Sequence, residues 1–347
     1  MYGNFDDAGY WPPRILRHAD VQAVLANSWW RQRHVIADAR ELVTRSEDCI
    51  VECSAGVRLL AQHTAGREPP SRTGDRVAIL LHGWEGSSQS VHVLSAADRL
   101  WRAGFRIIRL NMRDHGNTHH LNTGIFHSCR LQEMLDATQW VADRFPGESL
   151  YLAGYSLGGN FALRIAAAGS PAMRLSHVAA VCPVLDPEET MDALDSGLPI
   201  YRHYYLGKWR HSLEQKARLF PDEYHFGSLR RFTTLRAMTD YFVTHHSEFP
   251  DLKSYLDGYA ITGDRLAGLK VPSDLLLADD DPVVPVATIN RVARPPALVI
   301  HRTRWGGHCG YLEGARLRSW SDDFLAAVFD HAAADGPDPA HEGALSS

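Results

Sequence analysis

The sequence predicts an α/β fold, with a mostly parallel central sheet and helices on both of its faces. Short apolar runs of strand length alternate with stretches in which apolar residues recur at helical spacing, and this alternation is typical of βαβ units. One apolar run stops at a serine flanked by glycines and continues as a helix. The alternation is interrupted once, over residues 186–263. With 347 residues and 45% hydrophobic content, the chain can bury a large core.

The chain starts with a lead, residues 1–70, in which a short helix over about residues 21–33 precedes β-rich sequence. Residues 71–185 and 264–330 are expected to form the core of the fold. Its expected elements before the interruption are a strand at 76–81, a helix at 91–103, a strand at 105–110, a helix at 131–145, the run that ends at the serine, and a strand at 177–182. Strand signals return at Leu275, so the second part of the core completes the same sheet.

The interrupting segment, residues 186–263, is rich in Tyr, His, Arg and Phe and is expected to form a helical cap. An insertion between two parallel strands lies over the carboxyl edge of the sheet, above the serine. Its aromatic side chains either pack the core of the cap itself or line an apolar pocket; they are Tyr201, Tyr204, Tyr205, Trp209, Phe232, Tyr241 and Phe242. The tail, residues 331–347, is predicted to be disordered because of its Gly, Pro, Asp, Ala and Ser content.

The serine at the end of the apolar run is Ser156, in the sequence Y-L-A-G-Y-S-L-G-G. In a nucleophile elbow, glycines two before and two after the serine allow neighbouring backbone to pass close to a strained turn. Gly154 and Gly158 occupy those two positions. Apolar residues at helical spacing follow, which predicts a helix whose N-terminus points at the serine. Ser156 is therefore the candidate nucleophile.

Three consecutive carboxylates, Asp279, Asp280 and Asp281, follow the apolar run at residues 275–278. A serine nucleophile needs a histidine base, and the base needs an acid that fixes its orientation. Asp281 is the favoured acid because Pro282 fixes the turn directly after it. Asp280 remains open as the alternative, and Asp279 and Asp280 also fit the role of solvated or capping acids.

The candidate base is His308, which follows the apolar run at residues 297–300 in the loop W-G-G-H-C-G. Glycines on both sides of a histidine allow a loop to place an imidazole between a hydroxyl and a buried carboxylate. The neighbouring Cys309 is a rival nucleophile, although a small buried thiol is the better interpretation of it.

The amides of Trp84 and Leu157 are the candidate donors to an oxyanion. The strand at 77–81 opens into the loop H-G-W-E-G-S-S, which is the expected place for a second backbone N–H beside that of the residue after the nucleophile. The ring of Trp84 either forms one wall of an acyl pocket or packs beneath this loop.

The motifs resemble the α/β-hydrolase superfamily, and within it the YheT-type branch that also contains the eukaryotic ABHD1/2/3-like hydrolases. The resemblance covers residues from about 10 to about 325 and implies a serine hydrolase on an α/β-hydrolase fold. The chain departs from the branch at Arg113-Asp114-His115-Gly116, where an R-G-x-x-G loop is usual, and at Ser128-Cys129-Arg130. The segments that carry the resemblance are residues 10–17, 21–25, 82–88, 154–160, 280–282 and 306–308.

The composition limits the classes of partner and cofactor. A net charge of −5, spread along the chain, gives no indication of nucleic acid binding. Five cysteines without metal-ligand spacing indicate reduced thiols, and the pairs His119-His120 and His245-His246 are interpreted as polar loop or cap residues. No metal or organic cofactor is expected. No signal peptide or apolar run of spanning length is seen, so we expect a cytoplasmic protein without an integral membrane segment.

These features together predict a serine hydrolase that cleaves small-molecule or lipid carboxylic esters through an acyl-enzyme. Two alternatives are an acyltransferase that uses the same residues and a non-catalytic binding protein on the same fold. A dehalogenase or epoxide hydrolase is disfavoured because it needs an aspartate where Ser156 stands. The sequence leaves open the acyl chain length, the alcohol part and the oligomeric state.

Overall fold

A computed structural model describes residues 9–67 and 76–335, and its centre is an eight-stranded sheet in the order β1-β2-β4-β3-β5-β6-β7-β8. The strands are β1 (Glu47–Glu52), β2 (Arg58–Thr64), β3 (Arg76–Leu81), β4 (Arg106–Leu110), β5 (Ser149–Tyr155), β6 (Leu175–Val181), β7 (Ser273–Ala278) and β8 (Leu298–Thr303). β1 and β2 pair antiparallel, β2 joins β4 antiparallel, and every later pairing is parallel. The predicted fold class is confirmed.

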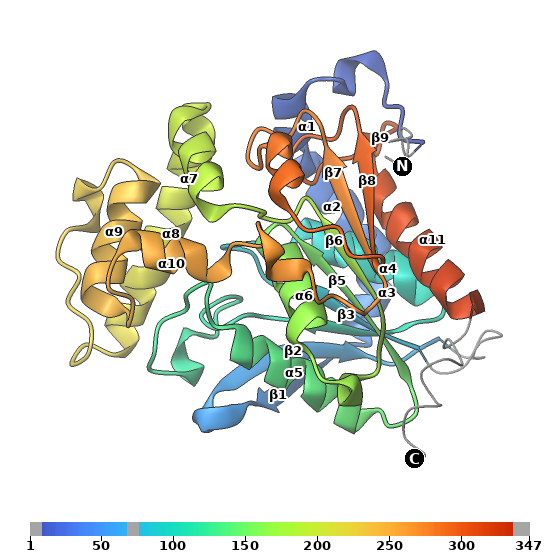
Figure 1. Cartoon of the computed structure of the whole chain (residues 1–347), viewed down its shortest axis with the longest axis horizontal. Coiled ribbons are helices and arrows are strands. Elements are labelled where there is room, and N and C mark those ends of the chain that lie inside the picture. The colour runs from blue at the N-terminus through green and yellow to red at the C-terminus, as the bar shows by residue number, and fades with distance from the viewer. Residues whose placement is uncertain (1–8, 68–75, 336–347) are drawn as a thin grey trace.

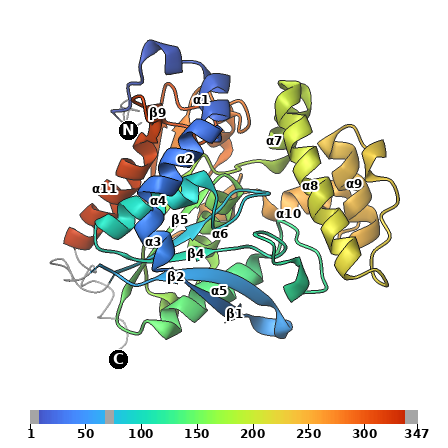
Figure 2. The same ribbon diagram turned by 180° about the vertical axis from the view of Figure 1, so that it is seen from behind.

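Helices cover both faces of the sheet. Figures 1 and 2 show α5 (Leu131–Arg144) and α6 (Leu157–Ala168) on one face, and α4 (Val91–Arg102) and α11 (Trp320–Asp335) on the other. The residues of β3 alternate between the two: Val77, Ile79 and Leu81 join the core under α5 and α6, whereas Ala78 and Leu80 join the core under α4 and α11. Because successive side chains of a strand point to opposite faces, a wholly apolar strand is what a sheet covered on both faces requires.

The N-terminal lead has more helix than predicted. The single helix expected at about residues 21–33 is wrong in extent, because the chain forms α1 (Ala19–Ala26), α2 (Trp29–Asp38) and α3 (Arg40–Thr44). The break lies at Ser28, whose hydroxyl accepts a hydrogen bond from the amide of Arg31 and caps α2. In Figure 2, α2 lies beside α4 on the outer side of the sheet.

The insertion between β6 and β7 is helical. It consists of α7 (Pro187–Ser196), α8 (Pro199–Leu219), α9 (Leu235–His246) and α10 (Leu252–Tyr259), which lie together beside the sheet in Figure 1. Side-chain caps mark three of the helix starts: Asp186, Thr234 and Asp251 each accept a backbone N–H of the following turn.

Short elements complete the chain, and they are β9 (Leu312–Glu313), β10 (Arg318–Ser319) and the 3₁₀ turns η1 (Arg14–Leu16), η2 (Ser54–Gly56), η3 (His119–Leu121), η4 (Pro171–Met173), η5 (Leu229–Arg231), η6 (Asp264–Leu266) and η7 (Val286–Arg291). The predicted disordered tail starts too early at residue 331, because α11 continues to Asp335 through an alanine-rich sequence that favours helix. The rest of that tail, residues 336–347, lies outside the described residues.

Among the described residues, no helix is both long and apolar enough to cross a membrane.

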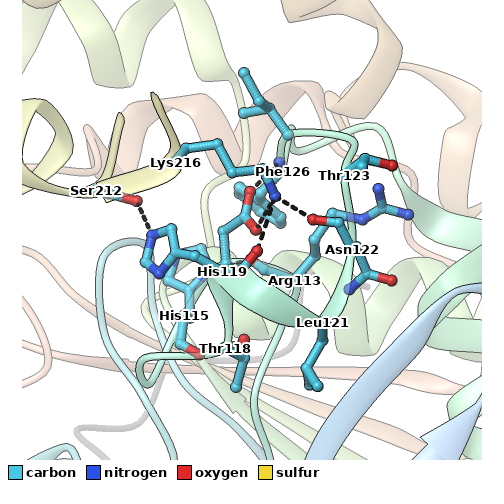
Figure 3. A network of polar contacts seen from close by, with 12 residues as sticks. Arg113, His115, Thr118, His119, Leu121, Asn122, Thr123, Phe126, Ser212 and Lys216 are labelled. Carbon is cyan, nitrogen blue, oxygen red and sulfur yellow. Dashed lines mark hydrogen bonds and ion pairs between the residues drawn. The ribbon is translucent and has the colours of Figure 1, made fainter. Parts of the chain in front are cut away.

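A buried ion pair fastens the insertion to the core (Figure 3). The ammonium of Lys216 on α8 donates to Asp114 Oδ1 at 2.8 Å and to the carbonyl oxygens of His119 and Asn122 at 3.2 and 2.6 Å. The other oxygen of Asp114 accepts the amide of Phe126 at 2.9 Å. All three protons of the ammonium therefore have acceptors, which offsets the cost of burying its charge.

His119, in the turn η3, belongs to the same contact, and its burial was not expected from the sequence. It was expected to be a polar loop or cap residue, but it is buried, with Nε2 2.8 Å from the Ser212 hydroxyl of α8. The insertion covers this loop, and a local sequence pattern does not reveal such a distant neighbour.

We predict that Lys216→Met destabilises the protein by about 3 kcal/mol, because it leaves the carboxylate of Asp114 buried without its charge partner. The side chains of Lys216 and Asp114 are only 1% and 4% exposed. Urea unfolding followed by circular dichroism measures the loss. Lys208→Met, at an exposed position of the same helix, is the matched control and should change little. Equal stability of wild type and Lys216→Met would show that the pair contributes nothing.

Candidate active site

Ser156 lies at the sharp turn between β5 and α6, with φ 53° and ψ −118°. A residue with a Cβ rarely adopts a positive φ, so the neighbouring packing must hold this conformation. The glycines of the motif make the turn possible. A Cβ on Gly154 would lie 2.2 Å from the carbonyl oxygen of Gly158, and a Cβ on Gly158 would lie 2.4 Å from the carbonyl oxygen of His82.

The structure brings Ser156, His308 and Asp281 together. His308 Nε2 lies 3.0 Å from Ser156 Oγ, and His308 Nδ1 lies 2.9 Å from Asp281 Oδ2. Asp281 Oδ1 also accepts the amides of Val283 and Val284 at 2.8 and 3.0 Å, so the turn after Pro282 holds this carboxylate in place. The side chain of Asp281 is 1% exposed and that of His308 is 10% exposed, which gives the contact between them a low-dielectric setting.

The two neighbouring aspartates lie elsewhere. Asp280 Oδ1 accepts the amide of Gly307 at 2.8 Å, so this side chain supports the loop that carries His308. Burial raises the pKa of Asp280. Asp279 forms an ion pair with Arg302 and is 41% exposed. Of the three aspartates that the sequence left open, Asp281 is therefore the one in contact with the imidazole.

The N-terminal lead supports the His308 loop, a role that the sequence analysis missed. Gly307 has φ +53°, and a Cβ there would lie 2.5 Å from the carbonyl oxygen of Ala19 at the start of α1. Gln22 of α1 is buried and accepts the amide of Leu312 at 2.8 Å, just beyond the loop. Nearly the whole chain separates these partners, so no local pattern in the sequence reveals the contact.

The loop after β3 lies against the serine: a Cβ on Gly83 would come within 3.3 Å of Ser156 Cβ. Two buried histidines hold this loop from behind. His82 donates from Nδ1 to the carbonyl oxygen of Gly83 and accepts the amide of Met112 at Nε2, and burial lowers its pKa to about 4. His115 accepts the amide of Glu85 at Nε2, and burial lowers its pKa well below the usual value. Both rings are therefore neutral and can accept backbone N–H groups at neutral pH.

A cavity opens from Ser156 and continues beneath the insertion. Its walls come from all four helices of the insertion, from the loop at 126–128 and from the elbow. Trp84 lines it and stacks on Tyr205, with ring centroids 5.4 Å apart and planes at 9°, so its ring both forms a wall and contacts the insertion. Of the seven aromatic residues expected in the insertion to pack its core or line a pocket, Tyr205, Trp209 and Phe242 line the cavity.

Cys309 does not compete with the serine. It is 3% exposed, and burial raises the pKa of its thiol well above the usual value, so the thiol stays protonated and is a poor nucleophile. Cys182, His308 and Cys309 are close enough to be considered as metal ligands, since their ligand atoms lie within 4.8 Å of one another. Both nitrogens of His308, however, already contact Asp281 and Ser156, so neither is free to bind a metal ion in this arrangement.

Several known proteins are similar in sequence to this chain. It is 23% identical over 285 residues to the medium-chain fatty acid ethyl ester synthase/esterase 2 of Saccharomyces cerevisiae, covering 73% of this chain and 61% of the yeast protein. It is 21% identical to YheT of Escherichia coli, covering 72% and 77% of the two chains. It is 22% identical to phospholipase ABHD3 of Mus musculus, covering 73% and 64%. The match spans less than two thirds of the yeast and mouse proteins.

Among solved structures, the esterase Pf2001 of Pyrococcus furiosus superposes with a TM-score of 0.55 at 15% identity, covering 84% of this chain and 91% of that one. This likeness supports the fold. YheT and ABHD3 come from the branch that the motifs predicted, so that prediction is confirmed. The model of the alpha/beta hydrolase fold matches residues 77–315, which is more than half of the sequence, and the chain therefore belongs to the α/β hydrolase fold family.

Proposed function

We propose that this protein hydrolyses carboxylic esters, with Ser156 as nucleophile, His308 as general base and Asp281 as the acid that orients the base. The observation that carries the proposal is the continuous chain of contacts from Ser156 Oγ through both nitrogens of His308 to Asp281. Contacts of this kind are what acyl transfer by an activated serine requires. The names of the yeast relative and of the Pyrococcus structure agree with ester chemistry.

In the proposed reaction, His308 Nε2 takes the proton of Ser156 as Oγ attacks the ester carbonyl. Asp281 holds the imidazole in the tautomer that has its hydrogen on Nδ1 and stabilises the imidazolium that forms. The amides of Trp84 and Leu157 receive the negative charge on the carbonyl oxygen. His308 then gives its proton to the leaving alcohol, and a water molecule, activated in the same way, releases the acid from the serine.

The lining of the cavity supports the proposal that the substrate has an apolar acyl chain. Aromatic and aliphatic side chains form most of its wall, and a chain that enters it leaves water and gains contact with Tyr205, Trp209 and Phe242. Residues 186–263 accordingly form a cap that determines which acyl chains reach the serine. The proposed substrates are small-molecule or lipid esters with an apolar acyl part.

Acyl transfer to an alcohol is the second candidate, because the yeast relative is named for both ester synthesis and hydrolysis. The same residues serve both reactions, since only the acceptor that attacks the acyl-enzyme differs. Product analysis by mass spectrometry in the presence of ethanol separates them: free acid indicates hydrolysis, and ethyl ester indicates transfer.

Ser156→Ala should abolish covalent labelling by a fluorophosphonate probe and lower turnover of p-nitrophenyl esters by several orders of magnitude, because it removes the hydroxyl that contacts His308 Nε2. A panel of esters from acetate to palmitate, run on both proteins, measures turnover and chain-length preference together. An unchanged melting temperature controls for folding. Labelling that persists in the variant would place the nucleophile elsewhere.

Asp281→Asn should lower turnover by about 10³- to 10⁴-fold, because an amide favours the wrong tautomer of the histidine. Asp279→Asn, which changes an exposed neighbour, is the matched control and should be nearly silent. Steady-state kinetics on one good ester measures both variants. A larger loss for Asp280→Asn than for Asp281→Asn would contradict the assignment and make the support of Gly307 the more important contact.

A further inference from the structure

The cavity beneath the cap has side chains with hydrogen-bonding atoms among its apolar walls. Thr190, Thr239, His127, Ser128 and Tyr255 all line it. Most of these atoms already have partners inside the protein. The hydroxyl of Thr239 donates to the carbonyl oxygen of Leu235 at 2.8 Å, and the hydroxyl of Tyr255 accepts the amide of Ser128 at 3.2 Å.

Two of the lining groups have no such partner. The hydroxyl of Thr190, on α7, and Nδ1 of His127, in the loop after η3, are buried atoms without a hydrogen bond to the described residues. The side chain of His127 is 3% exposed, and Thr190 is 8% exposed. Buried polar atoms are almost always hydrogen-bonded, and unpaired ones in a cavity indicate that a ligand or water completes them.

The surroundings of His127 determine which kind of partner Nδ1 needs. The ring packs edge to face against Phe249 and Tyr255 of the cap, which fixes its orientation. Burial lowers its pKa to about 4, so the ring is neutral at neutral pH. Its Nε2 also lacks a well-aligned hydrogen bond to the described residues, but it lies 3.2 Å from Glu248 Oε1, and the carboxylate favours the neutral tautomer that has its hydrogen on that nitrogen. Nδ1 is then a hydrogen-bond acceptor that has no donor among the described residues.

The hydroxyl of Thr190 complements this requirement. A threonine hydroxyl can both donate and accept, so it can bond any oxygen of a ligand. A hydrocarbon chain satisfies neither Thr190 nor His127, and a keto group can only accept from Thr190. A hydroxyl group on the ligand can donate to His127 Nδ1 and can also accept from Thr190.

From these contacts we propose that the preferred substrates are esters of hydroxy fatty acids, whose hydroxyl is recognised inside the cavity by His127 and Thr190. This inference rests on the proposed ester hydrolysis at Ser156 and names its substrate class. His127 and Thr190 act in substrate selection, because they contact the acyl chain and not the reacting carbonyl.

The test compares methyl esters of fatty acids with their hydroxylated counterparts of equal length. Hydroxyls at carbon 3 and at carbon 6 and beyond avoid the lactones that 4- and 5-hydroxy acids form. Acid release in a pH-stat gives kcat/KM for each pair. The wild type should prefer at least one hydroxy ester by about 10-fold, the value of one well-placed hydrogen bond. The keto ester of the same length should have a lower kcat/KM than the hydroxy ester, because a keto group cannot donate to His127 Nδ1.

Three variants assign the preference to residues. His127→Phe removes the acceptor and keeps a ring of similar shape, and Thr190→Val removes the hydroxyl and keeps the volume. Each should lower the ratio of kcat/KM between hydroxy and plain esters several-fold, and a merely structural role would lower both rates together. Thr239→Val is the matched control, because this hydroxyl lines the same cavity but is already bonded to Leu235. Its ratio should equal that of the wild type.

Different failures have different meanings. The inference is wrong if the wild type hydrolyses plain and hydroxy esters with equal kcat/KM. It is also wrong if His127→Phe and Thr190→Val both keep the wild-type ratio of kcat/KM between hydroxy and plain esters. In either case the ester hydrolase proposal stands. If no ester is hydrolysed at all, the proposed function is wrong and this inference falls with it. Thr190→Val, which changes neither volume nor shape, still tests the inference if His127→Phe lowers the melting temperature.

Discussion

Ser156 joins β5 to α6 with φ 53° and ψ −118°, a conformation that costs a residue with a Cβ about 1–3 kcal/mol. Contacts around the turn hold the serine in this conformation. The amide of Ser156 bonds the carbonyl oxygen of Val181 at the end of β6, and Gly154 and Gly158 leave room for the backbone on either side. The hydroxyl therefore lies beyond the end of the strand, where it contacts His308 and lies beside the loop that carries Trp84.

The position of the imidazole depends on contacts from two other segments of the chain. Two successive aspartates after β7 position it: Asp281 contacts the ring, and Asp280 accepts the amide of Gly307 in the loop that carries the ring. The start of α1 packs on the other side of that glycine, where a side chain would collide with Ala19. The N-terminal lead is therefore part of the support of the site, and the alignment of His308 depends on how α1 packs.

One continuous stretch of the core, from Asp114 to His127, makes several of the contacts with the cap. Asp114, at φ +61°, holds Lys216 of α8 and the amide of Phe126, and His127 follows directly. The segment that fastens the cap thus also supplies a wall of the cavity. Trp84 makes a second junction, because it belongs to the loop beside Ser156 and stacks on Tyr205 of the cap. The shape of the cavity is therefore coupled to the position of the loop that receives the oxyanion in the proposed reaction.

Local sequence determined the features that depend on neighbouring residues. Apolar runs gave the strands, the two glycines around Ser156 predicted the elbow, and the alternation of strands and helices predicted a sheet covered on both faces. Because parallel strands end at the same edge, the sequence could also place the segments of Ser156, Asp281 and His308 near one another. It misjudged the helices of the lead, where the cap at Ser28 starts a second helix, and the end of α11.

Only the tertiary structure decided the contacts between distant residues. Which of three adjacent aspartates touches His308 depends on how the turn after β7 lies against the loop after β8, and composition does not encode that geometry. The neutral state of His82 and His115 and the burial of Lys216 arise from packing between distant segments. The same packing leaves atoms of His127 and Thr190 without a hydrogen-bond partner in the described part of the chain. Burial and long-range hydrogen bonds decide the chemistry of these side chains, and both exist only once the core and the cap have come together.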